Sequence, residues 1–161
     1  MDDGISFAEL LRYTEEEHGR WREWFAAHPD ALDLPCDISG SGTVRRLVLH
    51  IFVSELIFSH AVLGLPRPDW QKLPIDTLDE LFSVSEDASA KFREFGAQAT
   101  AEDWREIIPW GTGDLKASRR KMVAQALLHA VHHRAQLATF LRQKGFDGLW
   151  VHDIILSKVM S

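Results

Sequence analysis

Three histidines in one short stretch of the sequence have the spacing of metal ligands. Residues 127–137 read LLHAVHHRAQL and contain His129, His132 and His133. Because residues four apart lie one above the other on a helix, His129 and His133 share a face, whereas His132 is rotated toward the flank. Two neutral imidazoles one turn apart can chelate one divalent cation, such as zinc, nickel, iron or copper.

The face that carries this pair is predicted to point into the protein core. Its other members are mostly apolar or uncharged: Met122, Gln125, Ala126, Gln136, Leu137 and Phe140. The pair is not the H-E-x-x-H signature of zinc proteases, because Ala130 follows His129 and no glutamate lies before His133. A third ligand must come from another part of the chain; otherwise the two histidines are hydrogen-bonded core residues.

His50 is the natural third ligand. It lies in a predicted helix that begins near Ser41 or Thr43 and ends by Gly64. The inward stripe of this helix is Leu47, His50, Ile51, Ser54, Ile57, Phe58 and Ala61. Burying a polar ring there costs stability unless the ring has a partner. Glu55 either orients an imidazole as a neighbour of the ligands or is a residue at the edge of the core.

Three more helices are predicted from apolar 3–4 spacing and from capping residues. The first covers residues 6–28, where Ser6 and Glu9 form a capping box. The other two cover about residues 75–97 and 116–144. Four long helices with apolar faces predict an all-α fold, a four-helix bundle with a long crossover connection and a short C-terminal segment.

The segments outside these helices are predicted less sharply. Residues 99–115 contain short apolar runs and a Gly-rich turn, which predicts a small hairpin or an extended crossover. This long connection is either a flap over the end of the bundle or a lid over the metal pocket, lined by Trp110. Residues 149–156 are apolar enough to pack back on the bundle as a short helix. His18, in the first helix, is expected to be partly exposed.

Composition limits the classes of function. A chain of 161 residues, 45% hydrophobic and 26% charged, predicts a single globular domain over residues 1–161. The formal net charge of −6 gives no basic surface for nucleic acid. The single cysteine, Cys36, excludes an internal disulfide, suits the cytoplasm and has acidic neighbours that disfavour a reactive thiol. We expect neither a signal peptide nor a membrane span, because the apolar stretch 47–65 is broken by polar residues.

Metal sites in helical bundles are built from inward side chains of facing helices. His50, His129 and His133 can therefore meet in the core. Three histidines with one position left open are typical of a catalytic metal site rather than of a closed structural one.

Three sequence features together match a known family. They are His50 within Leu-Val-Leu-His-Ile, the run His-Ala-Val-His-His-Arg-Ala-Gln-Leu that begins at His129, and Leu-Arg-Gln-Lys-Gly at residues 141–145. With these features the chain resembles the DinB-like superfamily over nearly its whole length. Ala135 stands where the family often has glycine, and a small residue there still lets a neighbouring helix approach.

The resemblance implies a helical bundle that holds a divalent metal, often zinc or nickel, on three histidines. In this sequence the three are His50, His129 and His133. Characterised members of the superfamily include thiol S-transferases that use mycothiol or bacillithiol, as well as isomerases and hydrolases. Many other members have no known activity.

Our main hypothesis is a metal-dependent S-transferase that uses a low-molecular-weight thiol as cosubstrate. The metal would bind the thiol, lower its pKa and hold it as thiolate for attack on an electrophile. The small-molecule substrate would lie in a pocket lined by Trp21, Trp24, Trp110 or Phe140. Arg134 either binds an anionic group or is structural.

Two alternatives remain at this stage. A metal-dependent hydrolase would use metal-bound water in place of the thiol. A non-catalytic binding protein would keep the histidines as structural core residues. In each case we expect a homodimer that binds neither nucleic acid nor membrane.

Overall fold

The structure, a computed structural model, describes residues 4–111 and 114–159 of the chain. The chain is mostly helical with little strand, which confirms the all-α class. The long helices are α1 (Phe7–Ala27), α2 (Val44–Leu63), α3 (Leu78–Gln98) and α5 (Arg119–Gln143).

The long helices begin where a side chain satisfies the free backbone N–H groups of the first turn. Ser6 and Glu9 form the predicted capping box at the start of α1. Thr43 caps α2, which ends at Gly64 with a positive φ of 69°. Thr77 and Ser118 cap α3 and α5 in the same way. Because Ser118 is a cap, the last helix starts later than the predicted residue 116.

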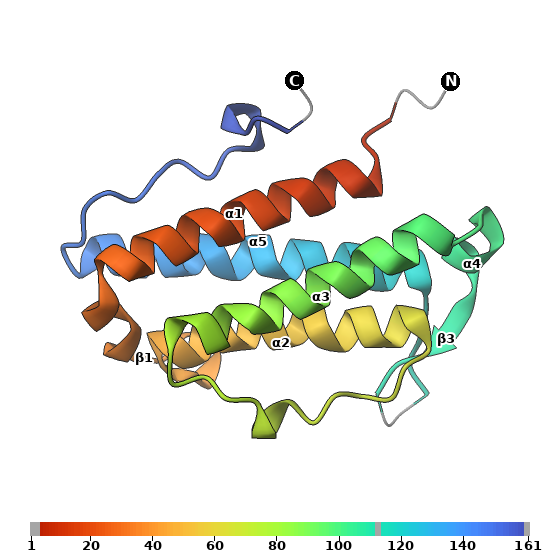
Figure 1. The fold of residues 1–161 in the computed structure, drawn as a ribbon, viewed down its shortest axis with the longest axis horizontal. Coiled ribbons are helices and arrows are strands. Elements are labelled where there is room, and N and C mark those ends of the chain that lie inside the picture. The colour runs from red at the N-terminus through yellow and green to blue at the C-terminus, as the bar shows by residue number, and fades with distance from the viewer. Residues whose placement is uncertain (1–3, 112–113, 160–161) are drawn as a thin grey trace.

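The four long helices lie side by side, and α1 and α2 each pack against both α3 and α5 (Figure 1). The connector after α2, residues 64–77, runs back along the molecule, so that α2 and α3 point in the same direction (Figure 1). It contains one 3-10 turn, Trp70–Lys72. The connector therefore flanks α2 and lines a groove beside it.

The segment between α3 and α5 contains the hairpin that was one of its two predicted forms. A short helix, α4 (Ala101–Arg105), is followed by β3 (Ile107–Pro109) and β4 (Lys116–Ser118). The strands are antiparallel, with Ile108 opposite Ala117. Two residues of the predicted Gly-rich turn, 112 and 113, lie outside the described residues.

A second short strand pair precedes α2. A 3-10 turn, Pro29–Asp33, leads from α1 to β1 (Pro35–Cys36), which pairs antiparallel with β2 (Gly42–Thr43). A further 3-10 turn, Ile38–Gly40, joins the two strands. This compact connection places the start of α2 at the end of α1.

The segment after α5 returns along α1 (Figure 1). Its described part is extended except for one 3-10 turn, Ile154–Leu156, so the prediction of a short helix was wrong for most of it. The prediction that it packs on the helices was right. The Tyr13 hydroxyl donates a hydrogen bond to the backbone oxygen of His152, 2.6 Å away, and Trp24 Nε1 donates to the backbone oxygen of Asp147.

The central helix α2 is buried on most of its circumference. Its buried residues include Leu47, Val48, Leu49, Ile51, Phe52 and Val53. The predicted inward stripe was therefore wrong in part: Leu47 and Ile51 are buried, but His50 and Ser54 lie on the least buried side. A helix that is apolar nearly all round gives no single face by spacing.

Among the described helices, α2 is also the one whose length and apolar composition would suffice to cross a membrane. Within the fold, more than half of that apolar window is buried against the other helices, as in the core helix of a folded domain.

Candidate metal centre

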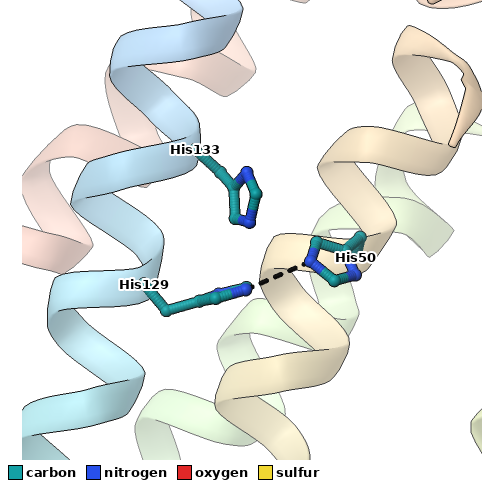
Figure 2. A group of neighbouring side chains, drawn as sticks. All are labelled: His50, His129 and His133. Carbon is teal, nitrogen blue, oxygen red and sulfur yellow. Dashed lines mark hydrogen bonds between the residues drawn. The ribbon is translucent and has the colours of Figure 1, made fainter. Parts of the chain in front are cut away.

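The three histidines singled out in the sequence lie together. His50 extends from α2 and His129 and His133 extend from α5, and all three rings point toward one another (Figure 2). The Nε2 atoms of His50 and His129 are 3.1 Å apart. One ligand nitrogen from each ring lies within 4.8 Å of the other two.

The cluster lies at the edge of the core rather than inside it. His133 is buried, with 6% of its surface exposed, and His129 is partly buried, while His50 is the most open of the three. Of the predicted inward face of α5, Met122, Ala126 and Leu137 are buried, and the buried stripe also includes Ala130 and Leu141. Gln125, predicted to point inward, is exposed. The position at the edge leaves the histidines open to an ion from solvent.

The surroundings keep the three imidazoles neutral. Burial, with smaller contributions from the neighbouring His133 and His50, lowers the pKa of His129 to about 4. Burial and the nearby His133 also lower the pKa of His50. Burial lowers the pKa of His133 as well, against the opposing effect of its hydrogen bond to Gln136. At neutral pH each ring therefore keeps a lone pair for a metal ion.

The distances and hydrogen bonds fit a divalent ion. Zinc–nitrogen bonds are about 2.0–2.1 Å long, so two nitrogens on one ion stand roughly 3 Å apart, close to the separation of His50 and His129. His133 Nδ1 lies 2.7 Å from Gln136 Oε1. Since that oxygen can only accept, Nδ1 carries the proton and Nε2 is left free for the metal, which is the usual arrangement around a metal-bound histidine.

Glu55, one of whose two predicted roles was to orient a ligand imidazole, and Arg134, predicted to bind an anion or to be structural, belong to another site. Glu55 is buried and pairs with His18, whose Nε2 lies 3.3 Å from Glu55 Oε1. Arg134 is 3% exposed and donates a hydrogen bond to the backbone oxygen of Thr14. The prediction of a partly exposed His18 was also wrong, because the carboxylate of Glu55 gives this buried ring a partner.

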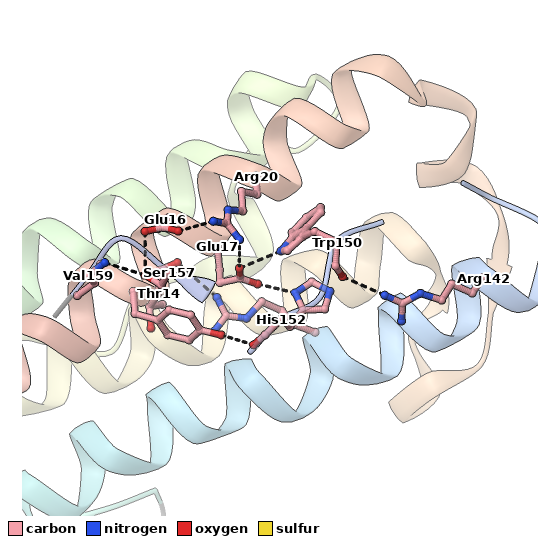
Figure 3. A network of polar contacts seen from close by, with 11 residues as sticks. Thr14, Glu16, Glu17, Arg20, Arg142, Trp150, His152, Ser157 and Val159 are labelled. Atoms are coloured by element: carbon pink, nitrogen blue, oxygen red, sulfur yellow. Dashed lines mark hydrogen bonds and ion pairs between the residues drawn. The ribbon is translucent and has the colours of Figure 1, made fainter. Parts of the chain in front are cut away.

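Sequence reasoning missed the carboxylate at the centre of this second site. Glu17 lies in the charged run Glu15–Glu17 of the first helix, which by composition favours a solvated face, but it is 1% exposed. It accepts hydrogen bonds from Trp150 Nε1 at 2.9 Å and from His152 Nδ1 at 2.5 Å (Figure 3). The signal was in the sequence, because Glu17 is three residues after Thr14 and four before Trp21 and so shares their buried face.

A groove of about 680 Å³ opens beside His50, between α2 and the connector that follows it. Its walls are largely apolar: Leu49, Val53, Ile57 and Phe58 from α2, and Trp70, Leu73 and Ile75 from the connector. Trp110 of the hairpin segment also lines the groove and stacks flat on Phe58, with ring centroids 4.1 Å apart. Trp110 is therefore positioned at one end of the groove.

The other three aromatic residues predicted to line the substrate pocket lie elsewhere. Trp21 packs against Trp150 in the segment after α5, with ring centroids 4.9 Å apart. Trp24 stacks on His28. Phe140 lies under the ammonium group of Lys144. The sequence pattern showed that these rings face inward but not that the returning C-terminal segment covers the two tryptophans.

The fold and the histidine cluster define a helical protein with a candidate three-histidine metal site. The model of the DinB family matches residues 1–154, and the chain belongs to this family. No curated protein matches the chain.

Proposed function

We propose that the protein is a divalent-metal-dependent enzyme whose ion, zinc or nickel, is bound by His50, His129 and His133. The observation that carries the proposal is the convergence of three neutral imidazoles beside an apolar groove. Its scaffold is a four-helix bundle in which residues 64–77 form the crossover connection. Membership of the DinB family agrees with this proposal.

The reaction that fits best is transfer of a low-molecular-weight thiol to an electrophile. When bound, the ion would lower the pKa of the thiol and hold it as thiolate. Cys36 does not supply the nucleophile, because it is 3% exposed and is not part of the groove. In the described part of the chain no aspartate or glutamate lines the groove either. With no carboxylate base in this lining, hydrolysis would depend on the ion alone to activate water, whereas a thiol cosubstrate brings its own nucleophile.

Each residue of the site has a distinct task in this proposal. Gln136 fixes the ring of His133 with the free Nε2 toward the other two histidines. Burial keeps His129 neutral. The apolar wall of α2, including Leu49 and Val53, holds the apolar part of the electrophile next to His50 and excludes water.

A non-catalytic protein with structural histidines is the competing function. The 3.1 Å contact between His50 and His129 favours it, because one Nε2 can donate a hydrogen bond to the other without any metal. In that case the two rings would satisfy each other by this hydrogen bond, and folding would be independent of metal. The two functions therefore differ first in metal content.

The first test is elemental mass spectrometry on untagged protein. We expect about one equivalent of zinc or nickel per chain in the wild type and almost none in His129→Ala. Absence of metal from the wild type after reconstitution with both ions would overturn the proposal.

The second test separates thiol transfer from hydrolysis. In protein substituted with cobalt, a bound thiolate gives a sulfur-to-cobalt charge-transfer band in the near ultraviolet, whereas a site for water gives none. We expect this band on addition of a small thiol, together with loss of free thiol when an alkyl halide is added. A cobalt-loaded protein with no such band for any small thiol would exclude the transferase.

A further inference from the structure

The groove beside His50 contains two arginines without a partner. Arg46 is in the first turn of α2 and Arg67 is in the connector after it, and both are exposed and line the groove. Neither guanidinium group has a hydrogen bond or an ion pair among residues 4–111 and 114–159. The adjacent Arg45 differs, because it donates to Asp33 and to the backbone oxygens of Ile75 and Asp76.

The charge of the groove is opposite to that of the whole protein. The chain has 24 acidic and 18 basic residues. The groove, in the described structure, has two arginines and no acidic residue among those that line it. A cleft of one sign of charge with apolar walls concentrates ligands of the opposite sign. The groove is therefore suited to an anion.

The groove also has the length for a ligand with an apolar body. The residues of α2 that line it run from Arg46 to Phe58 along one side of the helix. At 1.5 Å per residue, this side is roughly 18 Å long. His50 is one helical turn after Arg46, and Leu49 and Val53 lie beside it. A ligand held at Arg46 with its apolar body along α2 would pass directly by His50.

We propose that Arg46 and Arg67 make this groove selective for a small amphipathic carboxylate. A guanidinium group presents paired N–H donors that match the two oxygens of a carboxylate, and the apolar residues of α2 and the connector hold the rest of the molecule. Any reaction of this carboxylate at the histidines rests on the proposed function. Its binding does not, because binding needs only the groove.

The test compares two probes of nearly the same shape, phenylbutyrate and its uncharged amide. Their affinities for the full chain are measured by titration calorimetry. We expect the wild type to bind the acid about tenfold more tightly than the amide, as for a hydrogen bond to a charged group. This ratio should fall close to one in the double variant Arg46→Gln/Arg67→Gln. Arg105→Gln, which removes an exposed charge outside the groove, should keep the wild-type ratio.

A second comparison separates the arginines from the metal, since a carboxylate can also bind an ion. The preference for the acid should persist in His129→Ala, whether or not the wild type proves to hold metal. The inference is overturned by equal affinities in the wild type, by undetectable binding of both probes, or by a preference that survives in the double variant. A preference lost in His129→Ala would assign it to the metal instead. Because Arg46 and Arg67 are exposed, the variants should melt like the wild type.

Discussion

Two groups of histidines in this molecule have opposite surroundings. His18 and His152 each contact a buried carboxylate, that of Glu55 at 3.3 Å and that of Glu17 at 2.5 Å. The three histidines of the candidate metal centre contact one another and Gln136, and their cluster of ligand groups contains no carboxylate among the described residues. Histidine thus occurs in this molecule both beside a carboxylate and in a cluster without one.

The difference teaches what each group does for the protein. In the first group, the guanidinium of Arg134 interacts electrostatically with the carboxylates of Glu55 and Glu17 in the core, and Glu17 holds the returning C-terminal segment through His152. Buried charges of this kind stabilise a fold only as a set. In the second group the lone pairs have no cation to bind within the chain. These histidines are suited to bind an ion from outside.

The largest expected effect is on metal content. His133→Ala should remove almost all bound metal, as we also expect for His129→Ala, because two imidazoles hold an ion far less firmly than three. His152→Gln and His18→Gln should retain about one equivalent per chain, since their partners are carboxylates of the other group. Elemental analysis of all four proteins decides the comparison, and loss of metal from His18→Gln would break it.

The next effect concerns stability. Arg134→Met leaves Glu17 and Glu55 buried without their shared cation, and the free energy of unfolding should fall by about 3–5 kcal/mol. Arg142→Met is the matched control, because Arg142 is exposed and only donates to the backbone oxygen of Trp150. Its cost should be below about 1 kcal/mol. Urea unfolding of metal-free protein at neutral pH gives both values, and equal costs would contradict the assignment of Arg134 to the buried set.

A smaller effect is expected at acidic pH. Burial raises the pKa of Glu17, but the hydrogen bonds from His152 and Trp150 outweigh burial and lower it below its ordinary value of 4.5. The unfolded chain therefore takes up a proton before the folded one does, and this contribution to stability is lost as the pH falls below about 4.5. Glu17→Gln should cost roughly 1.5–3 kcal/mol at neutral pH and flatten the acid limb of the stability curve. A variant with the acid limb of the wild type would refute this role.

The smallest expected effect is on metal affinity. Gln136→Leu removes the acceptor that orients His133, and metal affinity should fall by about 10- to 100-fold. The stability of the metal-free protein should change little, because Gln136 is partly exposed. Competition with a chelator of known affinity measures the first value and thermal unfolding the second. An unchanged affinity would mean that packing alone orients the ring.

Much of the helical framework could be predicted because its signals are local. Ser6 with Glu9, Thr43 and Gly64 fix helix ends through hydrogen bonds and backbone preferences within one turn. The pair His129 and His133 was predictable for the same reason. The sequence also selected His50, although the expected inward stripe was wrong in part for a helix that is buried on most sides.

The features that could not be predicted depend on contacts between segments that are distant in sequence. Glu17 is satisfied by Trp150 and His152, more than 130 residues away, and no local pattern specifies that pairing. The groove depends on the path of residues 64–77 beside α2. That Arg46 and Arg67 line the same groove follows only from that path.

One feature of α5 links the two groups mechanically. His133 and Arg134 are consecutive, yet the first belongs to the metal centre and the second to the buried charges. Neighbouring residues on a helix differ by about 100° in direction, so turning α5 about its axis moves both at once. A twist of this helix that broke the hydrogen bond from Arg134 to Thr14 would also turn His133 away from His50. The contact of α5 with α1 on one side of the helix thus resists the rotation that would take the three rings on the other side out of alignment.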